Sequence, residues 1–122
     1  MVKSETIFVR PFNVEVRVLI GETIEECQNY WDKNITPLYD EGLFEKYSNA
    51  NGMSITMTRD GFPYHSLILL TEIDLDVIVH ECFHLIMEIA NMRGCKWSHK
   101  SDEFYAYMIQ DTFGQIYKIW TQ

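Results

Sequence analysis

The stretch from Asp74 to Met92 constrains the fold of this chain more than any other segment. Its apolar residues recur at helical spacing, and Gly94 follows where a helix C-terminal cap belongs. Thr71 and Asp74 are the candidates for the N-cap. Apolar residues occupy almost every side of the segment, so we expect a helix that is central and buried.

Two histidines lie four residues apart in this segment, in the sequence His80-Glu81-Cys82-Phe83-His84. Positions four apart share one face of a helix, so both imidazoles can aim at one point. Glu81 lies about 100° around the helix and can reach a water held by a metal. The pattern is expected about 0.01 times in a shuffled chain of this composition. It predicts a Zn²⁺ site with His80 and His84 as ligands and Glu81 as the general base. The alternative is a helix with two hydrogen-bonded core histidines.

A catalytic zinc usually has three protein ligands and one open position. The downstream candidates for the third ligand are His99, Asp102, Glu103 and Asp111. The connection from Gly94 to Ser101 has eight residues and can span about 26 Å, so the chain can return to the level of the histidines. Glu103 and His99 both stay within reach.

The sequence Glu103-Phe104-Tyr105-Ala106-Tyr107 begins the next helical segment. Here the chain resembles the gluzincins, over about residues 74–120. In that family the third zinc ligand is a glutamate on a helix downstream of the His-Glu-x-x-His helix, which implies Glu103. The pairing with Glu-x-x-Ala-Tyr is also similar to small phage-type zincins. The resemblance implies a zinc-dependent metallopeptidase that acts on a peptide or protein substrate.

The chain departs from related patterns at identifiable positions. The metzincin extension needs glycine at position 87 and histidine at position 90, and Met87 and Ala90 exclude it. Gluzincins often carry an aspartate four residues after the ligand glutamate, and Tyr107 stands there. Asp111 and Glu88 are the alternatives for that supporting role.

Alternation and turn signals predict the remaining elements. A strand runs from Phe12 to Ile20, and Pro11 separates it from the apolar run Ile7 to Val9. Thr23 and Glu26 form a capping box that begins a helix, which Pro37 stops. A strand is expected near Met53 to Met57, between the turns Asn51-Gly52 and Asp60-Gly61, and another from Tyr64 to Leu70. A short strand from Leu43 to Tyr47 is possible. The last element is a helix from Ser101 or Asp102 to Trp120.

The expected order is β-α-β-β-α-α in one domain of residues 1–122. It predicts an α+β fold, with a small antiparallel or mixed sheet of about four strands packed on the motif helix and two further helices. The resemblance implies that this fold is zincin-like. In zincins the substrate typically pairs with an edge strand, which would make the strand from Tyr64 to Leu70 the upper rim of the cleft.

Composition narrows the class of protein. Apolar residues make up 47% of the chain, and the net charge is −8 from 18 acidic and 10 basic residues. An acidic surface repels phosphate backbones and anionic lipids, so we expect no nucleic acid and no membrane partner. No apolar run approaches the roughly 18 residues of a membrane span, and the N-terminus does not resemble a signal peptide. With three widely spaced cysteines, we expect reduced thiols in a cytoplasmic protein.

Several other side chains have two interpretations. Tyr105 and Tyr107 could stabilise an oxyanion, a role we assign to Tyr107, with core packing as the alternative. His65 could line the cleft, but a strand histidine is more often partly exposed. Cys82 should point away from the metal as an inert buried thiol. Trp97 is a lid or partner anchor, or packs on its neighbours.

Three functions remain open on these grounds. The leading one is hydrolysis of peptide bonds by zinc and Glu81. The second is a non-catalytic zincin-like metal-binding module that binds a protein partner, because 122 residues leave little room for a second subdomain to build a cleft. The third is metal-dependent hydrolysis of another amide, such as a cell-wall peptide.

Overall fold

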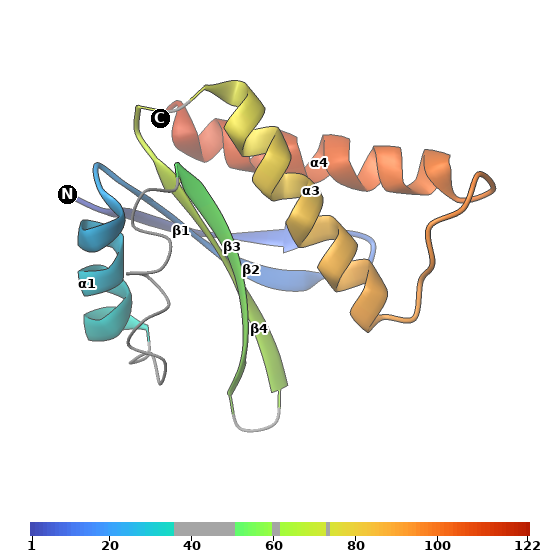
Figure 1. Ribbon diagram of the computed structural model, residues 1–122, viewed down its shortest axis with the longest axis horizontal. Coiled ribbons are helices and arrows are strands. Elements are labelled where there is room, and N and C mark those ends of the chain that lie inside the picture. The colour runs from blue at the N-terminus through green and yellow to red at the C-terminus, as the bar shows by residue number, and fades with distance from the viewer. Residues whose placement is uncertain (36–50, 60–61, 73) are drawn as a thin grey trace.

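The computed structural model describes residues 1–35, 51–59, 62–72 and 74–122. Over these residues the elements follow the order β-β-α-β-β-α-α (Figure 1). The predicted α+β class is confirmed, with three helices and a mixed sheet of four strands in the described part of the chain. The predicted order was wrong at the start, because two strands precede the first helix. The possible strand from Leu43 to Tyr47 and the Asp60-Gly61 turn lie outside the described residues.

The first two strands form an antiparallel hairpin, β1 (Lys3–Val9) and β2 (Val14–Gly21). The sequence placed the start of a single strand at Phe12, but Phe12 belongs to the turn between the strands. Asn13 reverses the chain there with a φ of 54°, a conformation that asparagine tolerates better than most residues. The short apolar run at Ile7 is part of β1, where pairing with Val16 supports it.

The other two strands, β3 (Gly52–Arg59) and β4 (Phe62–Leu70), pair antiparallel, as predicted. The sheet order is β1-β2-β4-β3, with β2 and β4 parallel. The expectation that the strand ending at Leu70 forms the edge was therefore wrong. β4 is paired on both sides, and β3 is the edge strand on that side among the described strands.

The three helices begin and end near the predicted boundaries. α1 (Ile24–Asn34) starts with the predicted capping residues, because the Thr23 side chain accepts a hydrogen bond from the Glu26 N–H at 3.0 Å. α3 (Leu75–Met92) follows Asp74, and Gly94 after it has a φ of 78°, which suits the predicted glycine cap. α4 (Asp102–Trp120) matches the predicted last helix.

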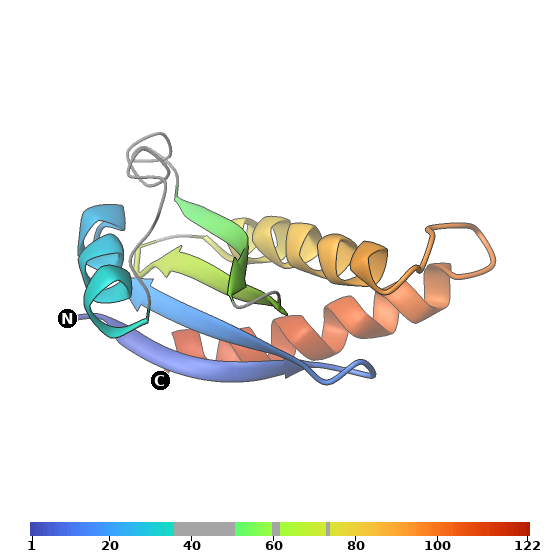
Figure 2. The same cartoon turned by 90° about the horizontal axis from the view of Figure 1, so that it is seen from below.

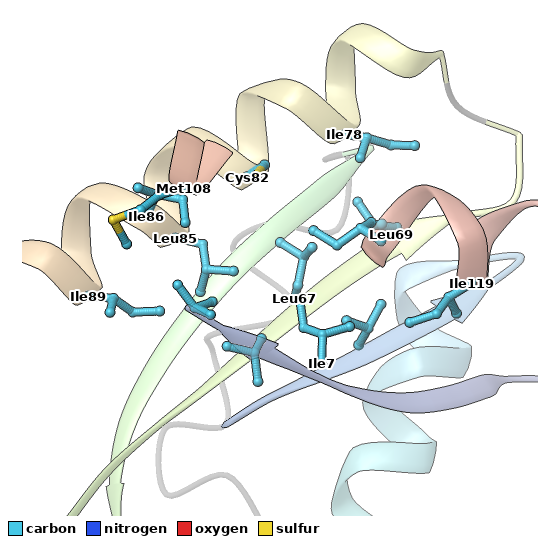
Figure 3. Packing of buried hydrophobic residues seen from close by; sticks show 14 of the residues in the cluster. Ile7, Leu67, Leu69, Ile78, Cys82, Leu85, Ile86, Ile89, Met108 and Ile119 are labelled. Carbon is cyan, nitrogen blue, oxygen red and sulfur yellow. The ribbon is translucent and has the colours of Figure 1, made fainter. Parts of the chain in front are cut away.

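The sheet carries a hydrophobic core on each face. β-Strand alternation sends Leu67 toward α3 and α4, and its neighbour Ile68 toward α1. Figures 1 and 2 show α3 and α4 side by side and α1 apart from them. The larger core joins β1, β2 and β4 to both long helices, through Ile7, Leu67, Leu69, Ile78, Leu85, Ile89, Met108 and Ile119 (Figure 3).

α3 is buried on one side only, which corrects the expectation of a helix surrounded by core. Leu75, Val79 and Phe83 are 47%, 45% and 43% exposed. The described helices and strands leave the outer side of α3 uncovered, so this side is exposed despite its apolar sequence. Among the described residues, no helix has the length and apolar character to cross a membrane.

Candidate metal centre

His80 and His84 lie on the exposed side of α3, and their imidazoles meet as predicted. Their Nε2 atoms are 3.1 Å apart, and the ring centroids are 4.7 Å apart with the planes at 76°. One helical turn separates the two residues, which explains why both rings reach the same point. The two nitrogens can therefore share a ligand or a proton.

The side chains of Cys82 and Glu81 point in other directions than the two imidazoles. Cys82 is fully buried, and burial raises the pKa of its thiol to about 12. Its sulfur lies 3.9 Å from the Ile109 carbonyl of α4, so the prediction of an inert thiol turned away from the histidines is confirmed. At 100° per residue, Glu81 lies about 100° around the helix from Cys82 and about 60° from His84, so Cys82 can face α4 while Glu81 lies beside His84.

Glu81 is 9% exposed and lies against the edge strand β3. Burial raises the pKa of its carboxyl, while attraction from His80, from His84 and from the backbone N–H of Ser54 lowers it. Buried carboxylates are costly without partners, and the partners here are the two histidines and one strand amide. The Glu81 carboxyl thus lies between α3 and β3, where the charges of both histidines act on it.

The histidine pair fits a zinc ion. Zinc binds imidazole nitrogen at about 2.0–2.1 Å in a tetrahedral arrangement, which places two ligand nitrogens about 3.3 Å apart. The observed separation of 3.1 Å is close to this spacing. Glu81 could hydrogen-bond a water on such an ion, since it precedes His84 by less than one turn. If zinc binds here, His80 and His84 would supply two of the three protein ligands that a catalytic zinc usually has.

The third ligand is not beside them. In the residues that the structure describes, no three His, Cys, Asp or Glu side chains form a group that could hold a metal ion. Glu103 is exposed in the first turn of α4, after the loop that extends beyond the end of α3 (Figure 1). The structure therefore does not bring Glu103 together with His80 and His84.

The other ligand candidates also lie apart from the pair. His99 and Asp102 are exposed around the same α3–α4 loop. Asp111 binds the Arg10 guanidinium through contacts of 2.7 and 3.1 Å and also accepts from Gln115. Glu88, expected only as an alternative for the supporting role, is exposed on α3 one turn beyond His84.

Neither tyrosine considered for oxyanion stabilisation joins the motif. Tyr105 is 1% exposed and packs against Trp97, with ring centroids 5.0 Å apart. Tyr107 is 63% exposed and lines a cavity of about 520 Å³ with Arg10 and Gly114 on the outer side of α4. Trp97 is itself 52% exposed, so its packing on Tyr105 is partial.

His65 is more deeply placed than a strand histidine usually is. It is 3% exposed, and its Nδ1 lies 2.7 Å from the Thr56 hydroxyl of β3. Burial lowers its pKa; among nearby charges, Glu88 raises it and Arg93 lowers it. It belongs to the polar part of the sheet that α3 covers, rather than to an open cleft.

Sequence reasoning missed the small residues of β3 that face α3. Gly52, Ser54 and Thr56 alternate with Met53 and Ile55, which pack on the α1 side. The alternation of small polar and large apolar residues was visible in the sequence. It was interpreted only as a strand after a turn, although glycine inside a strand also marks a close approach.

Comparisons with known proteins add no relative. No protein-family model, no curated protein and no solved structure matches this chain.

Proposed function

We propose that this chain is a small zincin-like, zinc-dependent metallopeptidase. The observation that carries the proposal is the convergence of the His80 and His84 nitrogens at 3.1 Å, next to a glutamate buried against an edge strand. Two histidines four residues apart with an adjacent glutamate are the donor set of a hydrolytic zinc site. The gluzincin resemblance supports peptide bonds as the substrate class.

The division of work follows from where each side chain lies. His80 and His84 would bind the ion on the exposed side of α3, where a substrate can approach. Zinc, when bound, polarises a carbonyl and lowers the pKa of a coordinated water. Glu81 would take a proton at its carboxylate and pass it to the leaving amine. The gluzincin resemblance implies Glu103 as the third ligand, but Glu103 lies apart from the pair, so no third ligand is assigned among the described residues.

A second candidate function is a zincin-like module that binds a metal and a protein partner without hydrolysis. Two observations favour it. Within the described segments, no third ligand accompanies the histidine pair. Leu75, Val79 and Phe83 also leave apolar surface exposed along α3. Exposed apolar rows on a helix are typical of protein contacts.

One experiment separates these functions. The purified chain is assayed for bound zinc and for cleavage of a broad peptide library, with and without a chelator. We expect stoichiometric zinc, and we expect Glu81→Gln to lower the cleavage rate about 10²–10⁴-fold with zinc content unchanged. Glu25→Gln, at an exposed position on α1, is the matched control and should leave cleavage unaltered.

The remaining outcomes point elsewhere. Zinc binding with an intact peptide library would favour the binding module. If no metal binds, both functions are rejected and the histidine pair is structural.

A further inference from the structure

The backbone conformation at position 52 does not require a glycine. The Asn51-Gly52 pair predicts a tight turn, but Gly52 is the first residue of β3, buried and paired with Leu69. Its φ lies outside the positive range that only glycine adopts readily. A turn or strained backbone therefore does not explain the glycine.

The space around Gly52 gives a different reason. A Cβ at this position would lie 3.2 Å from the Cγ of Glu81 and 3.2 Å from the Ile68 carbonyl oxygen. Such contacts are closer than side chains normally make. The absence of a side chain lets α3 approach the edge strand and lets Glu81 lie directly on it. Ser54 follows two residues later, and its backbone N–H attracts the Glu81 carboxylate.

Both residues of this contact are costly choices for stability alone. A glycine inside a strand loses more conformational entropy than other residues and contributes no packing. A carboxylate that is 9% exposed gives up most of its hydration. When two residues that each lower stability are in contact, function is the usual reason, because departures from favourable local structure and packing occur mainly at functional sites.

We infer that Gly52 is a positioning residue, which sets where the Glu81 carboxylate lies relative to the His80–His84 pair. The catalytic meaning of this inference rests on the proposed function, whereas the contact itself does not. Gly52 lies directly under the Glu81 side chain, and a Cβ there would require Glu81 to shift by a few tenths of an ångström relative to β3.

The first test is Gly52→Ala, with Gly114→Ala as the matched control. A Cβ at Gly114 meets nothing within 4 Å, so that variant adds the same methyl group in open space. We expect Gly52→Ala to lower kcat severalfold, because Glu81 must shift by a few tenths of an ångström and a full displacement of about 1 Å would cost about 100-fold. KM and bound zinc should stay the same. An unchanged kcat overturns the inference, as does an equal loss in Gly114→Ala.

The second test is a double-mutant cycle on unfolding, which needs no activity. Gly52→Ala should lower the denaturant midpoint of the wild-type chain, and lower it less in a Glu81→Ala background that lacks the Cγ. Folding of Gly52→Ala only in that background also supports the contact. Equal losses in both backgrounds, or failure to fold in both, place the clash at the Ile68 carbonyl and overturn the inference.

The two proposals can fail separately. A wild-type chain that cleaves no peptide rejects the metallopeptidase, while the cycle still decides whether Gly52 positions Glu81. Cleavage that depends on Glu81 but is insensitive to Gly52→Ala rejects the positioning role and keeps the enzyme.

Discussion

The outer edge of β1 is covered by side chains of α4, whereas no described element pairs with the outer edge of β3. The Gln115 amide accepts from the Phe8 N–H at 3.2 Å and donates to the Phe8 carbonyl at 2.8 Å, as a neighbouring strand would. Arg10 and Asp111 form an ion pair near the same edge. Unpaired strand edges are sites for added strands, and within the described residues only the edge at β1 is covered, while β3 lies against Glu81.

The face of the sheet under the long helices also differs between its β1 side and its β3 side. Toward β1, the face under the long helices is apolar, with Ile7 and Val9 fully enclosed. Toward β3, it carries Gly52, Ser54 and Thr56, and the buried His65. The first side is apolar, whereas the second carries small and polar residues. The predictions below test this difference, from the largest expected effect to the smallest.

The largest loss of stability should come from the apolar side. Ile116 is fully buried against the sheet, and Ile116→Ala should lower the free energy of unfolding by about 3 kcal/mol, as lost burial and a cavity combine. Ser54→Ala should change it by less than about 0.5 kcal/mol, because the buried Ser54 hydroxyl has no hydrogen-bond partner. Urea titration of both variants measures the contrast. Similar losses would show that the two sides contribute equally.

Zinc affinity should depend on the histidine pair of α3 and not on Glu103 of α4. His84→Ala removes a ligand atom and should weaken zinc binding by at least about 100-fold, beyond the effect of losing a supporting partner. Glu103→Gln should leave the affinity within about threefold, since Glu103 lies apart from the histidines. Competition with a chromogenic chelator gives both values. A large effect of Glu103→Gln would identify it as the third ligand.

Replacing Gln115 should expose the backbone groups at the outer edge of β1. Gln115→Leu loses two hydrogen bonds to the Phe8 backbone and should cost about 1–2 kcal/mol of unfolding free energy. Self-association should also rise, measured by light scattering, because β1 then offers unpaired groups. Gln110→Leu is the control at an exposed position on the same helix. Equal association of both variants would attribute the effect to added surface hydrophobicity.

The polar side should respond to mild acid through His65. Burial holds the pKa of His65 below its ordinary value, so the unfolded chain binds the proton more readily. Stability should therefore fall as the pH drops from about 7.5 to about 5.5, through the unfolded pKa near 6.5. In His65→Gln, urea midpoints should fall less over the same range. Parallel pH curves for the two chains would exclude His65 as the cause.

Much of the local structure could be predicted from the sequence. The cap at Thr23, the glycine after α3 and the convergence of His80 with His84 depend on neighbours within a few residues, and the structure agrees with each. Errors arose where distant segments decide the outcome. The run at Ile7 is a strand because β2 pairs with it, and Val79 is exposed because the described chain places nothing over it.

The sequence by itself determined that His80 and His84 share a face of one helix with Glu81 beside them, because helical spacing is a local property. Only the tertiary structure decided which strand that face meets. Sheet order depends on pairings between residues far apart in the chain, which placed β3, rather than β4, outermost among the described strands and next to Glu81. That arrangement gave Gly52 its contact with Glu81 and left Glu103 apart from the histidines.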